Sequence, residues 1–375
     1  MRILEVTNYT AGGCGVGMRV LKESKLLSDK GHKVVVFSTN YKKGSREICP
    51  PTEKIKDLII KRFSAKKLLF AGESYNVWNF EKEAKEFNPD LIIAHSYRHP
   101  HTKQALKIAK DIGCKVFLVT HAPFARSNTR NPIQNIGVYL YDLFFGRNLL
   151  KKFDKIIAIS KWEMPYLTKL GVPKSKIEYM PNGIDKEFFK PIKLLSNSPR
   201  VIGYWGRISR IKQLECLNRA LLFLLDTNYL VKIRGPAESD YLSELKEEIK
   251  NSKLENREEI NAESYSSGEQ IKGLDSMDIF VLPSKTEGMP QTLIEAMSRG
   301  KIVVASDNLA SRDLIIDGIN GFIFKNGDSK DLAMVLRKIK DLNLTKVNLI
   351  QKCARATAEK FKWDKILINL EKLIR

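Results

Sequence analysis

The stretch Glu287-Gly288-Met289-Pro290-Gln291-Thr292-Leu293-Ile294-Glu295 places two carboxylates eight positions apart, where the surrounding sequence predicts the junction of a strand and a helix. The apolar run before it, residues 278–284, ends in Pro-Ser and is typical of a buried strand of a parallel sheet. Pro290 suits the first position of a helix, and the apolar residues after it give that helix a packing face. We therefore expect a strand, a loop and a helix in that order.

The loop at this junction has the chemistry to hold an anionic or hydroxyl-rich ligand. Backbone amides point outwards at the start of a helix, where the helix dipole also favours negative charge, and Glu287 and Gly288 occupy that position. Glu295, about two turns into the helix, could accept two hydrogen bonds from a vicinal diol such as a ribose. The alternative is that Glu287 only caps the helix and that Glu295 is solvated.

The whole chain alternates between strand-like apolar runs and helical segments, which predicts an α/β protein with doubly wound parallel sheets. Its 375 residues exceed what one hydrophobic core usually holds, and residues 181–199 form a turn-rich linker with three prolines. We therefore expect a first domain over residues 1–181 and a second over 182–360, facing each other across a ligand cleft. The predicted strands are 3–7, 34–38, 91–94, 116–120, 156–159, 201–205, 230–233, 279–282, 302–305 and 322–324.

Three further loops follow predicted strands and carry groups that suit a phosphate or a sugar. Arg207 and Lys212 place two cations on one strand-to-helix loop, where they could clasp a diphosphate. Gly12 and Gly13 follow the first strand and open a helix, although their spacing does not match the full dinucleotide-binding pattern. His121 lies at the carboxyl end of the strand over 116–120, where its imidazole could bind a sugar or a phosphate oxygen; a structural role is the alternative.

The net charge of +21 is concentrated in the first half of the chain. The first 180 residues hold 32 of the 64 Lys and Arg but only 16 of the 43 Asp and Glu. Residues 54–70 and 126–155 mix these bases with apolar and aromatic residues, which suits an anionic membrane surface at about 1 kcal/mol for each base. Ordinary solvated faces are the alternative. No nucleic-acid-binding motif accompanies the charge, so no specific nucleic-acid partner is expected.

Cysteine usage and the absence of long apolar runs indicate a cytoplasmic protein, peripheral on the inner face of the membrane if the charge serves that role. The five cysteines are odd in number and scattered, without the spacing of a zinc site, so no metal is expected. The N-terminus reads as the first strand of a fold, and no run approaches the length of a membrane-spanning helix.

Together these stretches resemble the family-4 retaining glycosyltransferases of the GT-B fold. The resemblance extends over nearly the whole chain, with Glu-x7-Glu followed by Glu-Ala-Met as its most specific part. The other matching stretches, in order, are Gly12-Gly13, Thr120-His121-Ala122, Pro181-Asn182-Gly183-Ile184-Asp185, Gly206-Arg207 with Lys212, and Asp317-Gly318-Ile319-Asn320-Gly321-Phe322. Gln213 departs from the pattern, because the family often has glycine there.

The resemblance implies two Rossmann-like domains, with a C-terminal helix over 361–375 that packs back on the first. It also implies transfer of a sugar, with retention, from a UDP- or GDP-linked donor to a glycan or lipid-linked envelope precursor, without cofactor or metal. The chain lacks the Asp-x-Asp motif with which other glycosyltransferases hold a metal, and no carboxylate stands out as a nucleophile. The implied catalytic residues are Arg207, Lys212, Glu287 and His121.

The implied donor-binding residues are Gly12, Gly13, Gly235, Gly288, Met289 and Glu295. The acceptor is expected to meet Tyr97, Arg98 and His99, and a simple cluster at the start of a helix is the alternative for these three. A sugar-nucleotide epimerase of the same fold is the alternative among enzymes. A basic, non-enzymatic nucleic-acid-binding protein is the alternative from another class.

Overall fold

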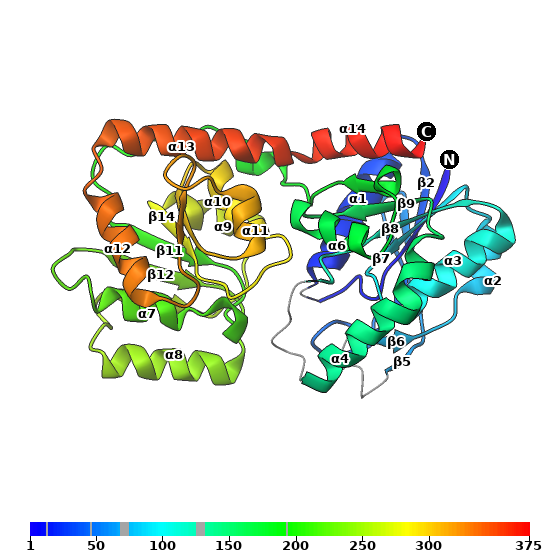
Figure 1. Ribbon diagram of the computed structural model, residues 1–375, viewed down its shortest axis with the longest axis horizontal. Helices are drawn as coiled ribbons and strands as arrows, with labels where there is room; N and C mark the ends of the chain where they lie inside the picture. Colours follow the sequence, from blue (N-terminus) through cyan, green and yellow to red (C-terminus); the bar gives the residue numbers. More distant parts are fainter. Residues whose placement is uncertain (13, 46, 68–74, 125–131, 193) are drawn as a thin grey trace. The chain divides into compact units, whose positions relative to one another are not determined.

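The computed structural model describes residues 1–12, 14–45, 47–67, 75–124, 132–192 and 194–375. The described chain divides into two compact units, one of residues 1–124, 132–182 and 366–375, and the other of residues 183–365. Each unit is a largely parallel sheet covered by helices (Figure 1), which confirms the predicted α/β class with two Rossmann-like domains.

The first unit is built on an eight-stranded sheet in the order β10-β9-β8-β7-β1-β2-β4-β3. Every neighbouring pair is parallel except β3 and β4 at one edge. The strand order reverses between β1 and β7, so the loops that leave the carboxyl ends of these two strands run in opposite directions. The strands are β1 (Arg2–Val6), β2 (Lys33–Thr39), β3 (Thr52–Ile55), β4 (Leu58–Phe63), β7 (Leu91–His95), β8 (Lys115–Val119), β9 (Lys155–Ala158) and β10 (Ile177–Tyr179), with a separate pair β5 (Lys66–Lys67) and β6 (Asn76–Val77).

Helices on both faces bury the apolar strands of this sheet. The third helix has typical residues at both ends. His99 precedes it, Pro100 is its first residue, and Gly113 ends it in the left-handed conformation. A short π-helix, η2 (Asp142–Gly146), continues the fourth helix. The helices are α1 (Gly15–Asp29), α2 (Glu81–Phe87), α3 (Pro100–Ile112), α4 (Pro132–Tyr141), α5 (Arg147–Leu150) and α6 (Met164–Lys169).

One predicted surface is different in the structure. Apolar residues over 54–70 were expected to form a surface together with the bases among them, but Leu58 and Ile60 are buried in β4, and residues 68–70 lie outside the described residues. The sequence there alternates with the period of two that belongs to a half-buried strand, and β3 and β4 pair as an antiparallel hairpin. The segment therefore closes the edge of the sheet instead of presenting an apolar face.

The second unit is built on a six-stranded sheet, entirely parallel, in the order β13-β12-β11-β14-β15-β16. The strand order reverses between β11 and β14, which is the topological switch point of a doubly wound fold. Five strands match the predicted runs closely, while β13 was not predicted. The strands are β11 (Val201–Trp205), β12 (Leu230–Arg234), β13 (Glu258–Asn261), β14 (Ile279–Leu282), β15 (Ile302–Ser306) and β16 (Phe322–Phe324).

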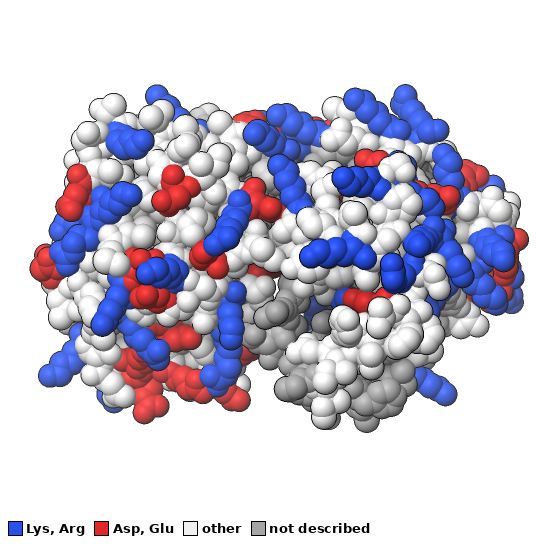
Figure 2. Space-filling model, viewed as in Figure 1, with Lys and Arg blue, Asp and Glu red and all other residues white. Residues whose placement is uncertain are grey.

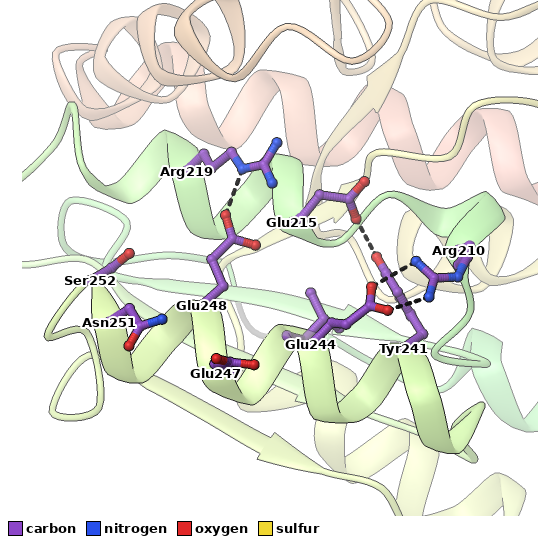
Figure 3. A pocket seen from close by; sticks show the side chains of 10 residues that line it. Arg210, Glu215, Arg219, Tyr241, Glu244, Glu247, Glu248, Asn251 and Ser252 are labelled. Carbon is purple, nitrogen blue, oxygen red and sulfur yellow. Dashed lines mark hydrogen bonds and ion pairs between the residues drawn. The ribbon is translucent and has the colours of Figure 1, made fainter.

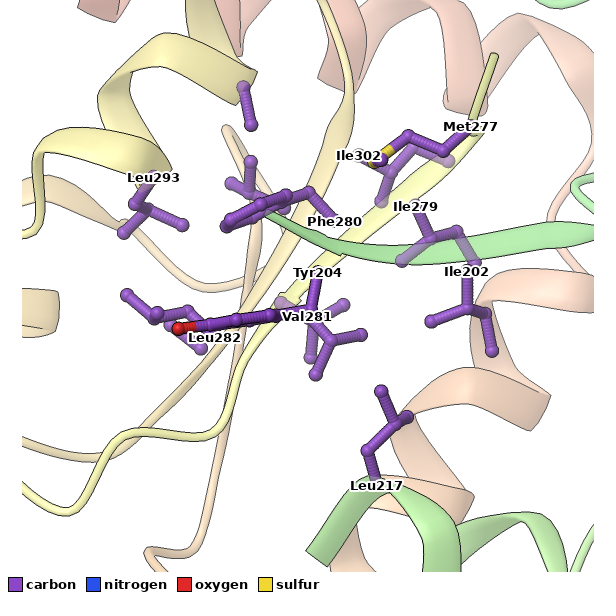
Figure 4. Close-up of a cluster of buried hydrophobic side chains, with 14 of the residues drawn as sticks. Ile202, Tyr204, Leu217, Met277, Ile279, Phe280, Val281, Leu282, Leu293 and Ile302 are labelled. Carbon is purple, nitrogen blue, oxygen red and sulfur yellow. The ribbon is translucent and has the colours of Figure 1, made fainter. Parts of the chain in front are cut away.

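The core of this unit is centred on β11 and β14, whose side chains are almost fully buried (Figure 4). Tyr204 stacks on Phe280 with ring centroids 6.3 Å apart, and its hydroxyl donates to the carbonyl of Arg207 at 2.8 Å. The ring thereby joins the core to the loop that follows β11. The helices are α7 (Glu215–Leu221), α8 (Ser239–Asn251), α9 (Ser267–Asp275), α10 (Gln291–Ser298), α11 (Leu309–Leu314), α12 (Ser329–Lys340) and α13 (Leu344–Ala358). The last helix, α14 (Trp363–Ile374), begins in this unit, but its residues from 366 onwards group with the first unit.

The loops after β11 and β12 touch through two glycines. Gly235 has φ +149°, and a Cβ atom there would lie 2.0 Å from the carbonyl oxygen of Gly206. The amide of Gly206 donates to the carbonyl of Arg234 at 3.0 Å, which holds the two loops at this spacing. The glycine at 235 is therefore required by packing, whether or not a ligand approaches it.

We expect Gly235→Ala to lower the free energy of unfolding by about 2 to 4 kcal/mol, because it adds a backbone clash to a strained φ. Gly318→Ala is the matched control, since Gly318 also has positive φ (+72°) but no atom within 4 Å of the added Cβ. Its loss should be about 1 kcal/mol. Urea unfolding measures the free energy of unfolding of both variants. Equal losses would show that the clash between the added Cβ atom and Gly206 does not destabilise the fold.

Candidate active site

The switch point of the second sheet brings together a predicted cation and a predicted carboxylate. Lys212 ends the short 3-10 turn after β11, and Glu287 lies in the loop after β14. Their Nζ and Oε1 atoms are 2.5 Å apart, and their side chains are only 17% and 13% exposed. The amide of Lys285 also donates to the carbonyl of Ile211 at 2.9 Å, so backbone and side chains join the two loops.

Arg207 lies on the same loop as Lys212 but is held differently. Its side chain is 62% exposed, and its closest carboxylate, Glu238, is 4.0 Å away. Such an exposed, long pair contributes little and leaves most of the charge available to an anion. Arg210 has a bidentate pair with Glu244 instead. Of the cations on this loop, Arg207 is thus the least neutralised by the protein itself.

The Glu-x7-Glu junction has the predicted strand-loop-helix form with one shift. Pro290 is the N-cap residue and α10 begins at Gln291, so Glu295 lies about one turn into the helix instead of two. Pro290 makes no side-chain cap bond, and among the contacts that the structure describes the carboxylate of Glu287 binds Lys212. Gly288 lies in the loop, and Met289 packs against the core of the unit.

Glu295 is buried beneath this loop. One of its carboxylate oxygens, Oε2, accepts from Nε2 of Gln270 at 2.5 Å, and the residue is 8% exposed, so it is not solvated. Burial raises the pKa of Glu295 to about 7, while hydrogen bonds from Gln270 and Gln291 act in the opposite direction. Gln270 and Gln291 thus occupy two of the acceptor positions of this carboxylate, and the others are those that a ligand hydroxyl could use.

In the first unit, His121 lies after β8 in a strained turn. His121 and Ala122 both have left-handed φ angles, +59° and +54°, which non-glycine residues adopt at a cost of about 1 to 3 kcal/mol. Buried Glu163 stabilises the turn, because it accepts from the hydroxyl of Thr120 at 2.5 Å and from the amide of Ala122 at 2.8 Å. Its other oxygen accepts from the amides of residues 159 and 160. The sequence analysis missed Glu163.

The glycine loop after β1 is only partly described. Gly12 has φ +84°, and a Cβ atom there would lie 2.5 Å from the carbonyl oxygen of Lys43. This close approach of two backbone segments explains the glycine without a ligand. Gly13, which was predicted to contact the donor, lies outside the described residues.

The residues predicted to meet the acceptor have partners inside the unit. Tyr97 is 2% exposed, and its hydroxyl donates to Oδ1 of Asp142 at 3.0 Å. Arg98 donates to the same carboxylate through Nε at 2.8 Å, and Nδ1 of His99 lies 3.0 Å from Nδ2 of Asn8. A Cβ atom on Gly146 would lie 2.2 Å from the Tyr97 hydroxyl. Tyr97 and Arg98 thus anchor the π-helix η2.

Helix α4 and η2, which this anchor holds, present an apolar surface. We call it the exposed ridge, and Lys and Arg gather elsewhere on the same unit in the view of Figure 2. Arg147, Lys151 and Lys152 follow it along the chain and are exposed. Among the described residues, no helix is long and apolar enough to cross a bilayer. The ridge consists of Ile133, Ile136, Tyr139, Leu140, Leu143, Phe144 and Phe145, which are 43% to 78% exposed.

A hollow of about 630 Å³ lies between α7 and α8, apart from the predicted site (Figure 3). Arg210 pairs with Glu244 and Arg219 pairs with Glu248, while the Tyr241 hydroxyl bonds Glu215. Glu247 adds a fourth carboxylate to its lining. Four carboxylates against two guanidinium groups give this hollow a negative character, which disfavours an anionic ligand.

Two family models match the chain in succession. Glycosyltransferase Family 4 matches residues 13–188, and Glycosyl transferases group 1 matches residues 185–359. The matches meet close to the boundary between the two units and together include all the predicted site residues except Gly12.

Individual proteins are similar over varying shares of the chain. An amylovoran biosynthesis glycosyltransferase of Erwinia amylovora is 29% identical over 53% of this chain, a match that spans about half (49%) of that relative. The N,N'-diacetylbacillosaminyl-diphospho-undecaprenol alpha-1,3-N-acetylgalactosaminyltransferase of Campylobacter jejuni is 24% identical over 81% of this chain and 83% of its own length. Anabaena Alr3699/HepE, solved with UDP and glucose, superposes with a TM-score of 0.74 at 20% identity, covering 100% of this chain and 99% of that one.

Proposed function

We propose that this chain, which belongs to the family-4 glycosyltransferases of the GT-B fold, transfers a sugar with retention from a nucleoside diphosphate sugar to a glycan or lipid-linked acceptor. The observation that carries the proposal is the meeting of Lys212 and Glu287 at the switch point of the second sheet. Ligands of doubly wound sheets bind at that point, and a cation beside a carboxylate offers contacts for a phosphate and a sugar hydroxyl.

Arg207 and Lys212 stabilise the leaving group in this proposal. When the glycosidic bond breaks, negative charge grows on the diphosphate, so fixed cations stabilise the transition state more than the bound donor. Two cations in this place can supply what a metal would supply, and the chain has no Asp-x-Asp motif. We therefore expect transfer without an added metal.

In this proposal, Glu295 and Glu287 contact different parts of the donor. Glu295 accepts hydrogen bonds from the ribose, with Gln270 orienting its carboxylate. Glu287 meets the transferred sugar. UDP is the nucleotide present in the Anabaena relative, which supports a UDP-linked donor, and a GDP-linked donor is the second candidate. A calorimetric screen of UDP-, GDP- and ADP-sugars tests this choice.

Retention implies that the acceptor attacks from the face that the diphosphate leaves. The leaving phosphate then takes the proton of the acceptor hydroxyl, and His121 contacts the donor sugar or the phosphate oxygen. The anomeric configuration of the product, read by NMR immediately after transfer, distinguishes retention from inversion. An inverted product would contradict this mechanism.

The acceptor we propose is a lipid-linked or envelope glycan precursor, presented at an anionic membrane on the cytoplasmic side. The Campylobacter relative is named for an undecaprenol-linked acceptor, and the Erwinia relative for an exopolysaccharide. The exposed ridge, with exposed bases after it, has the apolar and cationic character that such a surface attracts.

Arg207→Ala and Lys212→Ala should each reduce the rate of transfer by about tenfold to a hundredfold, because each removes a charge-assisted hydrogen bond worth roughly 1.5 to 3 kcal/mol. Arg210→Ala is the matched control, since it removes a cation from the same turn that already pairs with Glu244. Its transfer rate should stay near that of the wild type. Near-normal turnover in folded Arg207→Ala would contradict the diphosphate contact.

The two glutamates should differ in calorimetry and in turnover. Glu295→Gln should weaken nucleoside diphosphate binding, because the ribose contact acts in the ground state. Glu287→Gln should leave that affinity unchanged or raise it, because Lys212 is released, while turnover falls. Since the pKa of Glu295 is about 7, wild-type affinity should fall as the pH is lowered from 8 to 6. A pH-dependent affinity in Glu295→Gln would assign the titration to another group.

Liposomes with acidic lipid should retain the protein at low salt and release it as salt screens the attraction, whereas neutral liposomes should not. Replacing both Phe144 and Phe145 by Ser should weaken retention by on the order of tenfold. Leu225→Ser is the matched control, because Leu225 is 64% exposed in the second unit. Equal retention by acidic and neutral liposomes, or by neither, would refute the membrane role.

A further inference from the structure

His121 is the outer end of a row of three hydrogen-bonded side chains, and the proposed function does not use the two beneath it, His95 and Glu5. Nε2 of His121 lies 3.0 Å from Nδ1 of His95, and Nε2 of His95 lies 2.5 Å from Oε2 of Glu5. Glu5 and His95 are fully buried, whereas His121 is partly exposed. The chain therefore runs from a carboxylate in the core of the first unit to a ring at its surface.

The sheet itself aligns these three groups. Glu5 on β1 pairs in register with Ile93 on β7, and His95 follows Ile93 by two residues, so both side chains point to the same face. His95 in turn pairs with Val119 on β8, two residues before His121. Glu5 and His95 lie on β1 and β7, the two neighbouring strands between which the strand order reverses.

The charged groups around these three side chains come mainly from α1. Arg19 donates from Nε to Glu23 at 3.1 Å, and both residues are buried. Glu5, Glu23 and His95 place ligand-type atoms within 4.8 Å of one another, and the guanidinium of Arg19 supplies a positive charge beside them.

Helix α3 adds two further rings, His99 and His101. Nε2 of His101 bonds the carbonyl of His95 at 2.7 Å, and the ring of His99 stacks on that of His101 with centroids 5.6 Å apart. Burial lowers the pKa of His101 and of His121, and the nearby ring of His99 acts in the same direction on both.

We propose that Glu5 and His95 are positioning residues that determine which ring nitrogen of His121 carries the proton. Loss of one proton from Glu5 converts Nδ1 of His121 from a hydrogen-bond donor into an acceptor.

The two states follow from the donor and acceptor capacity of each group. With Glu5 protonated, its O–H donates to Nε2 of His95, Nδ1–H of His95 donates to Nε2 of His121, and Nδ1 of His121 carries a proton. With Glu5 ionised, every proton shifts one step: Nε2–H of His95 donates to Glu5, and Nε2–H of His121 donates to His95. Nδ1 of His121 is then bare, and one proton has left the three side chains through the partly exposed ring of His121.

The pKa values of these groups place the change in the tautomer of His121 near neutral pH. Burial raises the pKa of Glu5 to about 8, against the charge of Arg19 and the hydroxyl of Ser24. Burial lowers the pKa of His95 to about 3 and that of His121 well below its usual value, so both rings stay neutral. Below about pH 8, His121 thus presents an N–H donor, which suits a phosphate or hydroxyl oxygen.

The contact of His121 with the donor rests on the proposed function, but the tautomer can be measured without it. Nitrogen-15 shifts of labelled histidine distinguish protonated from bare ring nitrogens, and the chain has five histidines. His121→Asn identifies the signals of His121 by their loss. In the intact wild-type protein, we expect Nδ1 of His121 to be protonated at pH 6.5 and bare at pH 9.5, with a midpoint near 8. A single tautomer throughout would overturn the proposal.

Glu5→Gln should fix His121 in one tautomer at every pH, because Gln does not titrate. Glu258→Gln is the matched control: it removes another buried glutamate whose pKa is raised to about 8, in the second unit, and should leave the transition of His121 unchanged. A transition that persists in Glu5→Gln, or disappears in Glu258→Gln, would refute the assignment to Glu5.

An assay of transfer extends the test to the reaction. In the wild type, kcat should fall about tenfold for each pH unit above the midpoint while KM for the donor changes little, and Glu5→Gln should remove this fall. A fall that persists in Glu5→Gln would show that the tautomer does not govern turnover. If no sugar is transferred at all, the proposed function fails, while the nitrogen-15 titration still decides the relay.

Discussion

The reversal of strand order in each sheet is the constraint on which the chemistry of this chain depends. Parallel strands send their carboxyl ends to one edge, and at the reversal the loops leave in opposite directions, so polar side chains from neighbouring strands and loops can meet there. In the second unit the reversal lies between β11 and β14 and holds Lys212 and Glu287. In the first unit it lies between β1 and β7 and holds Glu5 and His95.

Much of this arrangement could be predicted from the sequence, because buried parallel strands are continuous apolar runs and the loops after them carry the polar residues. The strand β13 was missed because Glu258-Glu259-Ile260-Asn261 at the sheet edge is mostly polar. Glu5 and Glu163 were missed for a different reason: their partners are 90 and 43 positions away and become neighbours only through the sheet. The sequence offered one indication of a role for Glu5, which is that this charged residue stands inside the apolar run 3–6.

The buried carboxylates make stability depend on pH in a definite direction. Burial raises the pKa of Glu5 to about 8 and that of Glu163 to about 7, so the folded protein holds these protons more tightly than the unfolded chain does. Their stabilising contribution is complete below about pH 4.5 and is lost as the pH rises through 7 to 8. His95 acts in the opposite sense, because its pKa is lowered to about 3 and acid below pH 6.5 destabilises the fold. The stability of the first unit therefore falls both towards low pH and towards high pH.

The pair of Lys212 and Glu287 gives the proposed reaction an additional advantage. Without a donor, the carboxylate neutralises the cation, so a diphosphate must compete with Glu287 for Lys212. The bound donor carries less charge on its bridging oxygen than the departing diphosphate does, so the exchange becomes more favourable as the bond breaks. The interaction is thus weak in the ground state and strong in the transition state, which is the condition for faster turnover without tighter binding. Glu287, released by the same step, becomes available to the hydroxyl groups of the transferred sugar.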